Sequence, residues 1–221
     1  MISKTVARFF LVFLLAGLLS TVGACSVTTK PCGFDVKTLG DLDPAILQLA
    51  LKAQNKSHAQ GQVKNKDVLT IIDYSKPSHQ KRLWVLDLKT KKVLHHTYVA
   101  HGQRSGVRTP EQFSNRAGSH QSSVGVFVTG EPYQGKHGLS LRLHGLERDF
   151  NDNAYHRAIV MHGAHYVTEQ HARKGYLGRS HGCPAVPHGL VRPIVQNIKE
   201  GTLFFVYYPD KAWLKKSSFL V

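Results

Sequence analysis

The sequence predicts a mainly β domain with minor helices. Short runs of apolar or alternating residues recur along most of the chain, which is typical of strands. One connection between two such runs, residues 89–92, has the length of a hairpin loop. The expected strands cover residues 68–74, 82–88, 93–100, 124–129, 139–144, 158–162 and 203–208. Together they define a β-rich domain over residues 67–209 of the 221-residue chain.

One helix is expected before this domain. Asp43 and Pro44 are a capping residue and a first-turn residue, and an apolar stripe follows them to about Ala53. Residues 54–66 are polar and are interpreted as a linker. Residues 25–66 would therefore form an N-terminal helix and a polar linker.

Helical patterns within and after the domain are few. Residues 168–174 follow the capping residue Thr168 and are closed by a glycine. Residues 191–200 show a second helical pattern that is also closed by a glycine. The tail, residues 210–221, is basic and then apolar, and its function is not predicted.

The first residues have the layout of a secretory signal. Lys4 and Arg8 precede an uncharged apolar run, residues 9–22, and two small residues then lead to Cys25. The run has 14 residues, whereas a membrane-spanning helix needs about 20. Residues 1–24 are therefore expected to be removed on export.

Residues 22–25 resemble the lipobox of bacterial lipoproteins. The resemblance implies that Cys25 is lipidated and becomes the first mature residue, which anchors the protein to a membrane without spanning it. Ser26 in the next position implies outer-membrane sorting if the organism is Gram-negative. The alternative is ordinary cleavage to a soluble periplasmic or secreted protein.

The charge balance indicates an anionic partner. The chain has 29 Lys and Arg against 14 Asp and Glu, and loss of Lys4 and Arg8 would leave a mature net charge of +13. An exported protein without an aromatic-interleaved binding motif meets cell-wall polymers or anionic lipid rather than nucleic acid. The oligomeric state is left open.

Three cysteines are too few for a disulfide framework. With Cys25 lipidated, Cys32 and Cys183 remain; without lipidation, Cys25 and Cys32 could pair. Cys183 is a candidate free thiol in both cases.

The residues around Cys183 favour a nucleophile. Gly182 allows a sharp turn, so that the backbone N–H groups of Gly182 and Cys183 can face a substrate oxygen and form an oxyanion hole. Pro184 stiffens the exit from this turn. A thiol also needs a base, and His162 is the candidate because it ends an expected strand. A backbone carbonyl near Gly163 would fix its tautomer.

A thiol with such neighbours is expected to have a pKa below its ordinary value of about 8.5.

The paired motif His162-Gly163 and Ser180-His181-Gly182-Cys183 resembles the hallmark of the YkuD-like L,D-transpeptidases in order and spacing. The family fold implied by this resemblance is a β-rich sandwich with a cleft. No metal or nucleotide cofactor is implied.

The resemblance extends over most of residues 68–209. Residues 118–123, 135–143 and 179–187 are similar to a branch described as murein L,D-transpeptidase catalytic-domain proteins. One departure follows the cysteine, where many members have a hydrophobic residue and then Arg or Asn, thought to help hold substrate. This chain has Pro184 and Ala185 there, which leaves open the acceptor and the balance between transfer and hydrolysis.

The family reaction implies that Cys183 attacks the carbonyl of the third residue of a peptidoglycan tetrapeptide stem. The product is a thioester, with His162 moving the protons and with Ser180 and His181 ordering the cleft. An acceptor amine would complete a cross-link, whereas water would make the enzyme an L,D-carboxypeptidase. Further candidates for the cleft are Ser122, Ser123, His137 and Arg142.

Three alternatives stay open. One is a carboxypeptidase or endopeptidase that acts on the same stems. Another is a metal site, since the chain holds a set of potential zinc ligands in a short span, although their spacing matches no standard zinc pair. The third is a non-catalytic wall-binding lipoprotein. The potential ligands are His162, His165, His171, His181 and Cys183. His165 and His171 are otherwise interpreted as solvated or structural.

Overall fold

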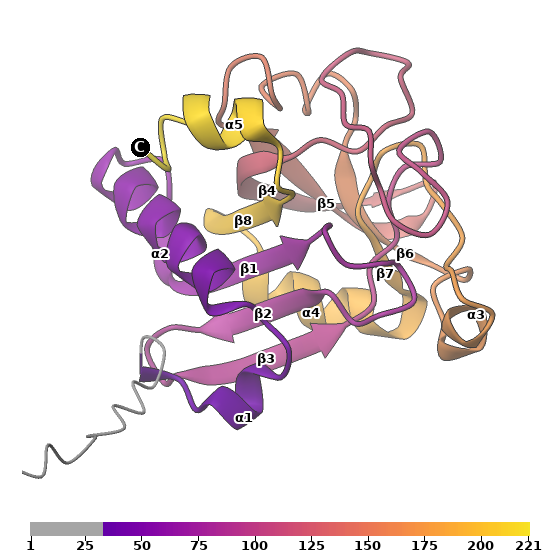
Figure 1. The fold of residues 1–221 in the computed structure, drawn as a ribbon, viewed down its shortest axis with the longest axis horizontal. Coiled ribbons are helices and arrows are strands. Elements are labelled where there is room, and N and C mark those ends of the chain that lie inside the picture. The colour runs from indigo at the N-terminus through magenta and orange to yellow at the C-terminus, as the bar shows by residue number, and fades with distance from the viewer. Residues whose placement is uncertain (1–32) are drawn as a thin grey trace, which may run out of the picture.

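The structure, a computed structural model, describes residues 33–221 (Figure 1). The expected signal segment, the lipidation site Cys25 and Cys32 lie outside these residues. Within the described part of the chain, no helix is long and apolar enough to cross a membrane.

Eight strands form one hydrogen-bonded sheet in the order β3-β2-β1-β8-β4-β5-β6-β7, and the helices are few and mostly short. The strands are β1 (Asn65–Asp73), β2 (Leu83–Asp87), β3 (Lys92–Thr97), β4 (Gly125–Gly135), β5 (Gly138–Gly145), β6 (Val160–Ala164), β7 (Ala185–Pro187) and β8 (Thr202–Tyr207). The helices are α1 (Val36–Leu39), α2 (Pro44–Ala59), α3 (Glu169–Arg173), α4 (Val191–Ile198) and α5 (Lys211–Lys216). The predicted fold class, mainly β with minor helices, is confirmed.

Both faces of the sheet are covered, which explains why its strands have nearly continuous apolar sequences. In β8, Leu203 and Phe205 belong to one buried cluster while Phe204 and Val206 belong to another. Side chains alternate between the faces of a strand, so each cluster takes every second residue. A strand that is solvent-exposed on one face would alternate apolar and polar residues instead.

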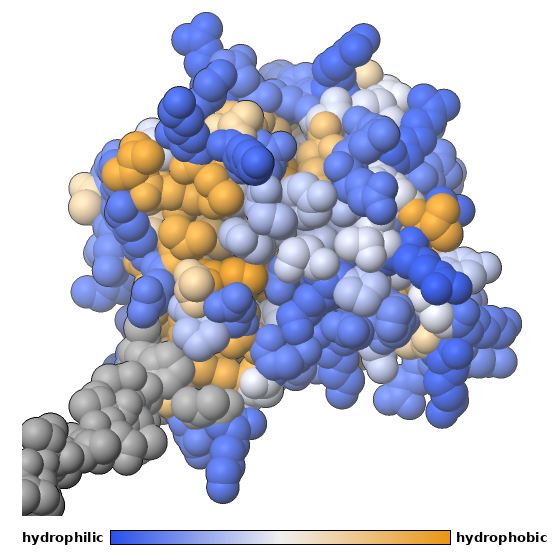
Figure 2. All heavy atoms as spheres, viewed as in Figure 1, coloured by the Kyte–Doolittle hydropathy of each residue, from blue (hydrophilic) through white to orange (hydrophobic). Residues whose placement is uncertain are grey.

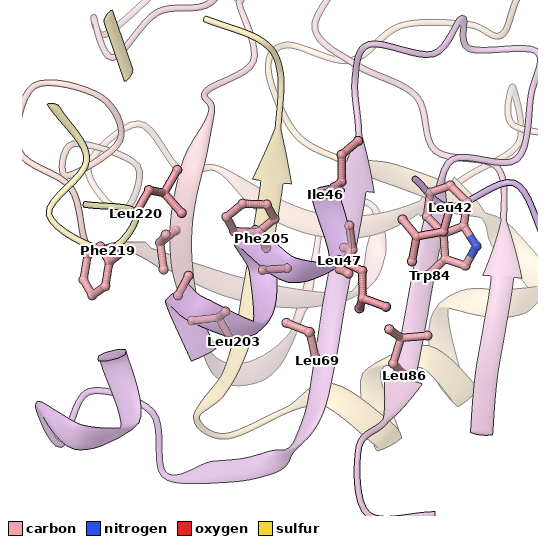
Figure 3. Close-up of a cluster of buried hydrophobic side chains, with 14 of the residues drawn as sticks. Leu42, Ile46, Leu47, Leu69, Trp84, Leu86, Leu203, Phe205, Phe219 and Leu220 are labelled. Carbon is pink, nitrogen blue, oxygen red and sulfur yellow. The ribbon is translucent and has the colours of Figure 1, made fainter. Parts of the chain in front are cut away.

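Helices α2 and α4 cover opposite faces of the sheet (Figure 1). On the α2 face, Ile46 and Leu47 of the helix pack with Leu69, Trp84 and Phe205 of the strands, as Figure 3 shows. On the other face, α4 contributes buried residues to the second cluster; these are Val191, Ile194, Val195 and Ile198. The two cores hold the sheet rigid from both sides.

Helix α2 is longer than the sequence predicts. The expected helix ends near Ala53, but α2 continues to Ala59 through the first part of the stretch interpreted as a linker. Two of its polar residues are buried and bonded there, since Ser57 Oγ donates to Ala53 O at 2.6 Å and Gln54 Nε2 donates to Lys66 O at 2.9 Å. Because these residues are polar, the sequence does not indicate that this face of the helix packs on the sheet.

The other differences concern short elements. Helices α1 and α5 and strand β7 are absent from the prediction, and each spans too few residues to show a periodicity. The expected hairpin between β2 and β3 is present, and the predicted cap of α3 is confirmed, because Thr168 Oγ1 accepts from the His171 N–H at 3.2 Å.

The C-terminal tail packs into the core. Trp213 of α5 is fully buried and its Nε1–H donates to Glu147 Oε2 at 2.9 Å. Burial raises the pKa of the Glu147 carboxyl, against hydrogen bonds that lower it. Lys52 of α2 donates to Leu220 O at 2.6 Å, so the tail joins the N-terminal helix.

In Figure 2 apolar colour gathers on the left of a face that is otherwise mainly hydrophilic.

We predict that Trp213→Ala destabilises the protein by about 3–5 kcal/mol, because it empties a buried aromatic site and removes one of the donors to the Glu147 carboxylate, which keeps the Val126 N–H. Urea unfolding measures this loss. The exposed Lys215→Ala on the same helix should change stability by no more than about 0.5 kcal/mol. A loss below about 1 kcal/mol for the tryptophan variant would show that the tail is not part of the folded core.

Candidate active site

The two segments of the predicted catalytic motif meet through strand pairing. Strand β6, which carries His162, pairs in parallel with β7, and His162 is the register partner of Ala185. Cys183 stands two positions before Ala185, so the turn that carries it lies beside the base. A cavity of about 260 Å³ opens at this point. It is lined by Lys136, His137, His162, Tyr166, Arg179, Ser180, His181 and Cys183.

The sulfur of Cys183 lies against the start of β6. Its Sγ is 3.5 Å from Val160 N and 3.6 Å from Ala158 O. Ala158 has a φ of 54°, a left-handed conformation that non-glycine residues rarely adopt and that precedes the strand. This bend accounts for β6 beginning at Val160 rather than at the predicted residue 158.

Burial raises the pKa of the Cys183 thiol, while the Val160 N–H and the positive charge of Arg157 act in the opposite direction. The expectation of a depressed pKa is therefore wrong for the free enzyme. Donors near the sulfur can be expected from the sequence, whereas burial of the sulfur arises only in the folded structure. The thiol is accordingly neutral near pH 7.

His162 is buried in β6 and is oriented by the backbone. Its Nδ1 lies 3.0 Å from Gly163 O, so Nδ1–H donates and Nε2 is left as the acceptor nitrogen. Burial lowers the pKa of His162, His137 lowers it further, and the hydrogen bond to Gly163 acts against them. The ring is therefore neutral near pH 7, which is the form that can accept a proton.

Ser180 shapes the turn that holds the nucleophile. Its Oγ donates to Cys183 O at 2.6 Å and accepts from the Gly182 N–H at 3.1 Å. Gly182 has a φ of 122°, and a Cβ there would lie 2.8 Å from Gln121 O, so both conformation and space require glycine. Because Ser180 engages the Gly182 N–H, only one of the two expected oxyanion donors is free. That donor is the Cys183 N–H, which has no partner within residues 33–221.

Arg157 is a part of the site that sequence reasoning missed. Its guanidinium donates to Ser123 Oγ at 2.6 Å, Ser119 Oγ at 3.1 Å and Gln121 O at 2.7 Å, and also bonds Ser114 O. It forms no ion pair with an acid in the described part of the chain. It thus ties a long loop against the nucleophile turn and adds a positive charge near the sulfur. No local pattern in the sequence marks such a residue.

The further cleft candidates divide into two groups. Ser122 Oγ donates to Gly182 O at 3.2 Å, and His137 lines the cavity, where its ring stacks on His162 with centroids 4.5 Å apart. Ser123 reaches the site only through its bond to Arg157. Arg142 is not among the lining residues, and its Nε lies 2.6 Å from Glu131 Oε1.

The structure does not gather the histidines of the metal hypothesis. His181 stacks on His120 and His165 stacks on His188, with centroids 4.3 and 4.4 Å apart. His171 Nδ1 lies 2.8 Å from Thr168 Oγ1. Among residues 33–221, no three His, Cys, Asp or Glu side chains are grouped so that they could hold a metal ion.

We predict that Cys183 reacts with neutral iodoacetamide along a pH profile whose midpoint lies above the ordinary thiol value, since burial disfavours the thiolate. Arg157→Gln should move the midpoint further upward because it removes a nearby positive charge. Arg157→Lys should restore part of the shift, and Arg148→Gln, which removes an exposed charge outside the cavity, should leave the profile unchanged. A midpoint at or below the ordinary value would contradict the burial argument.

Comparison with known proteins identifies the family. A family model described as the L,D-transpeptidase catalytic domain matches residues 39–207. No curated protein matches the chain. Among solved structures, an L,D-transpeptidase from Mycobacterium smegmatis is 14% identical with a TM-score of 0.42, over 64% of this chain and 59% of that one.

Two other solved structures show similar values. An L,D-transpeptidase from Xylanimonas cellulosilytica is 17% identical with a TM-score of 0.36, over 63% of this chain and 60% of that one. The helical cell shape determining protein Pgp2 from Campylobacter jejuni is 11% identical with a TM-score of 0.42, over 74% and 57%. The chain thus spans less than two thirds of each of these structures. The family model matches more than half of the chain, and the protein belongs to the L,D-transpeptidase catalytic-domain family, of the YkuD type.

Proposed function

We propose that this protein is a peptidoglycan L,D-transpeptidase that works through a thioester on Cys183. Family membership indicates an enzyme of the L,D-transpeptidase type that acts on peptidoglycan stems. The observation that carries the finer proposal is the pairing of β6 with β7. This pairing brings a partly exposed thiol and a histidine with a free Nε2 to one cavity.

The acylation step begins from a neutral pair. The Cys183 proton moves to His162 Nε2 as the sulfur attacks the carbonyl carbon of the third stem residue. The Cys183 N–H donates to the oxygen that becomes negative. The C–N bond to the terminal D-residue then breaks, and the leaving amine takes the proton from Nε2. The products are a thioester and the free terminal residue.

The second step decides the type of enzyme. An amine from an acceptor stem attacks the thioester carbon, a C–N bond forms and the C–S bond breaks. His162 takes the surplus proton of the amine and returns one to the thiolate. Water in place of the amine gives L,D-carboxypeptidase activity, or endopeptidase activity if the bond cleaved is a cross-link. Transfer is the proposed outcome, with hydrolysis of the same stems as the alternative.

We predict that Cys183→Ala abolishes release of the terminal D-residue from tetrapeptide muropeptides. His162→Ala should lower the rate by about 100-fold or more, since a positioned general base contributes roughly that much. His171→Ala is the matched control, because His171 lies on α3 outside the cavity. Mass spectrometry of the muropeptides measures release of the terminal D-residue. Mass spectrometry of the enzyme after exposure to a carbapenem measures acylation of Cys183.

The outcomes of this experiment separate the alternatives. A new cross-linked dimer in the presence of an acceptor supports transfer. Tripeptide without dimer converts the proposal to a carboxypeptidase. Intact tetrapeptide together with an unmodified Cys183 after carbapenem exposure would leave a wall-binding protein as the better proposal.

The proposed location is the periplasm, with the mature chain held to the outer membrane through lipid on Cys25. The basic residues, the short apolar run and Cys25 in the sequence support export of this kind. We predict that a labelled fatty acid is incorporated into the full-length protein and that Cys25→Ala abolishes the label. Cys183→Ala is the matched control and should retain it. Unlabelled wild-type protein in the soluble fraction would contradict the anchor.

A further inference from the structure

The cavity around Cys183 carries positive charge and no negative charge. Its lining includes Lys136 and Arg179 but no Asp or Glu. Neither cation forms an ion pair with an acid in the described part of the chain. A cavity whose charged lining residues are all cations attracts an anion. The positive net charge of the protein strengthens this attraction.

Arg179 is fixed in place by the backbone around it. The next residue, Ser180, donates its N–H to His101 O at 2.9 Å, and the Gln103 N–H donates to Ser180 O at 2.8 Å. The Arg179 Nη1 lies 3.4 Å from both Gln103 O and Gly106 O. These long bonds hold one nitrogen, and the other guanidinium donors have no partner among residues 33–221.

Lys136 reaches the cavity from a different element. It occupies the two-residue turn between β4 and β5, where Gly135 pairs with Gly138. Its neighbour in that turn, His137, stacks on His162. The turn is therefore held over the base, and the lysine beside it joins Arg179 around the cavity.

The strand after the nucleophile supplies no polar group for this purpose. Ala185 is fully buried and packs in a cluster with Ala100 and Ala164. The expected site for a substrate-holding side chain is thus turned into the core. Any anionic part of a substrate beside Cys183 meets Lys136 and Arg179 instead.

We infer that Lys136 and Arg179 form a carboxylate-binding subsite, which holds the donor peptide by a carboxylate next to the scissile bond. This inference rests on the proposed function, because it gives the donor a peptide carboxylate. The guanidinium fork of Arg179 suits a carboxylate with two parallel hydrogen bonds, and Lys136 adds a point charge. The subsite places the scissile carbonyl toward the sulfur of Cys183.

The test compares two alkylating agents that differ in one group. Iodoacetate carries a carboxylate where iodoacetamide carries a neutral amide, and in both the Cys183 sulfur displaces iodide. The ratio of their rates cancels any change in the pKa of the thiol. In the wild type this ratio should exceed that of free cysteine and should fall as salt screens the charges.

Removal of either cation should lower the ratio. Arg179→Gln should reduce it about tenfold, the factor that corresponds to about 1.4 kcal/mol of lost charge-assisted bonding, and Lys136→Gln should reduce it less. An unchanged midpoint of thermal unfolding shows that the variants are folded, and any change in the thiol pKa alters both rates equally and cancels in the ratio. Arg148→Gln and Lys211→Gln are matched controls, since both residues are exposed and lie outside the cavity. Equal ratios in the wild type and in both cavity variants would overturn the inference.

Peptide donors identify which carboxylate is held. Tetrapeptide donors would have either the terminal carboxylate or a side-chain carboxylate of the third residue blocked as an amide. Amidation of the carboxylate that the subsite holds should raise KM in the wild type. The same amidation should have little further effect on KM in Arg179→Gln. If the cavity variants lower the alkylation ratio but the wild type turns over no peptide, the anion site is supported and the proposed function is rejected. Turnover with unchanged KM and an unchanged ratio rejects the anion site alone.

Discussion

The proposed catalytic arrangement depends on the parallel pairing of β6 with β7. The pairing sets His162 opposite Ala185 and so fixes where Cys183 stands relative to its base. Strand β7 has only three residues, yet it is held on both sides, since the Ala100 N–H donates to Ala185 O at 2.8 Å. Small side chains at Ala100, Ala164 and Ala185 let these backbones approach closely. A larger residue at this junction would move the nucleophile away from the base.

The thiol of Cys183 and the imidazole of His162 form a pair that is neutral before the proposed reaction. Burial raises the pKa of the Cys183 thiol and lowers that of His162, so neither group is charged near pH 7. In the proposed reaction, charge appears when the thiol proton moves to His162 and the carbonyl oxygen becomes negative. The Cys183 N–H and the Arg157 guanidinium are already in position at that moment. Interactions that strengthen only as charge develops lower the barrier rather than stabilising the ground state.

Rigid support explains how a short turn can hold these groups. His162 lies in a strand between two others, and the sheet is packed on both faces. The turn itself is cross-linked by Ser180 and by the loop that Arg157 ties down. Residues held by strands and by bonded turns keep their geometry better than residues on free loops. The tail contributes at a distance, because Trp213 is fully buried in the cluster between α2 and the sheet.

The polar residues of the site could be chosen from the sequence only where a local pattern marked them. Gly182 and Cys183 stand in one short motif, and His162 ends an apolar run, so both halves were recognisable. Arg157 could not be chosen, because arginines are frequent in this basic chain and no local pattern marks it. Arg179 adjoins the nucleophile motif, but nothing in the sequence shows that its side chain lines the cavity. Their partners, such as Gln121 and Gln103, are far from them in sequence.

Local sequence alone determined the class of the fold and identified the predicted catalytic motif of this protein. Alternating and apolar runs specify strands because side chains alternate across a sheet, and the nucleophile motif is contiguous. Only the tertiary structure decided the raised thiol pKa, the helical character of residues 54–59 and the loss of the Gly182 N–H to Ser180. Burial and hydrogen-bond partners are properties of groups that meet in space, and the order of residues along the chain does not specify them by itself.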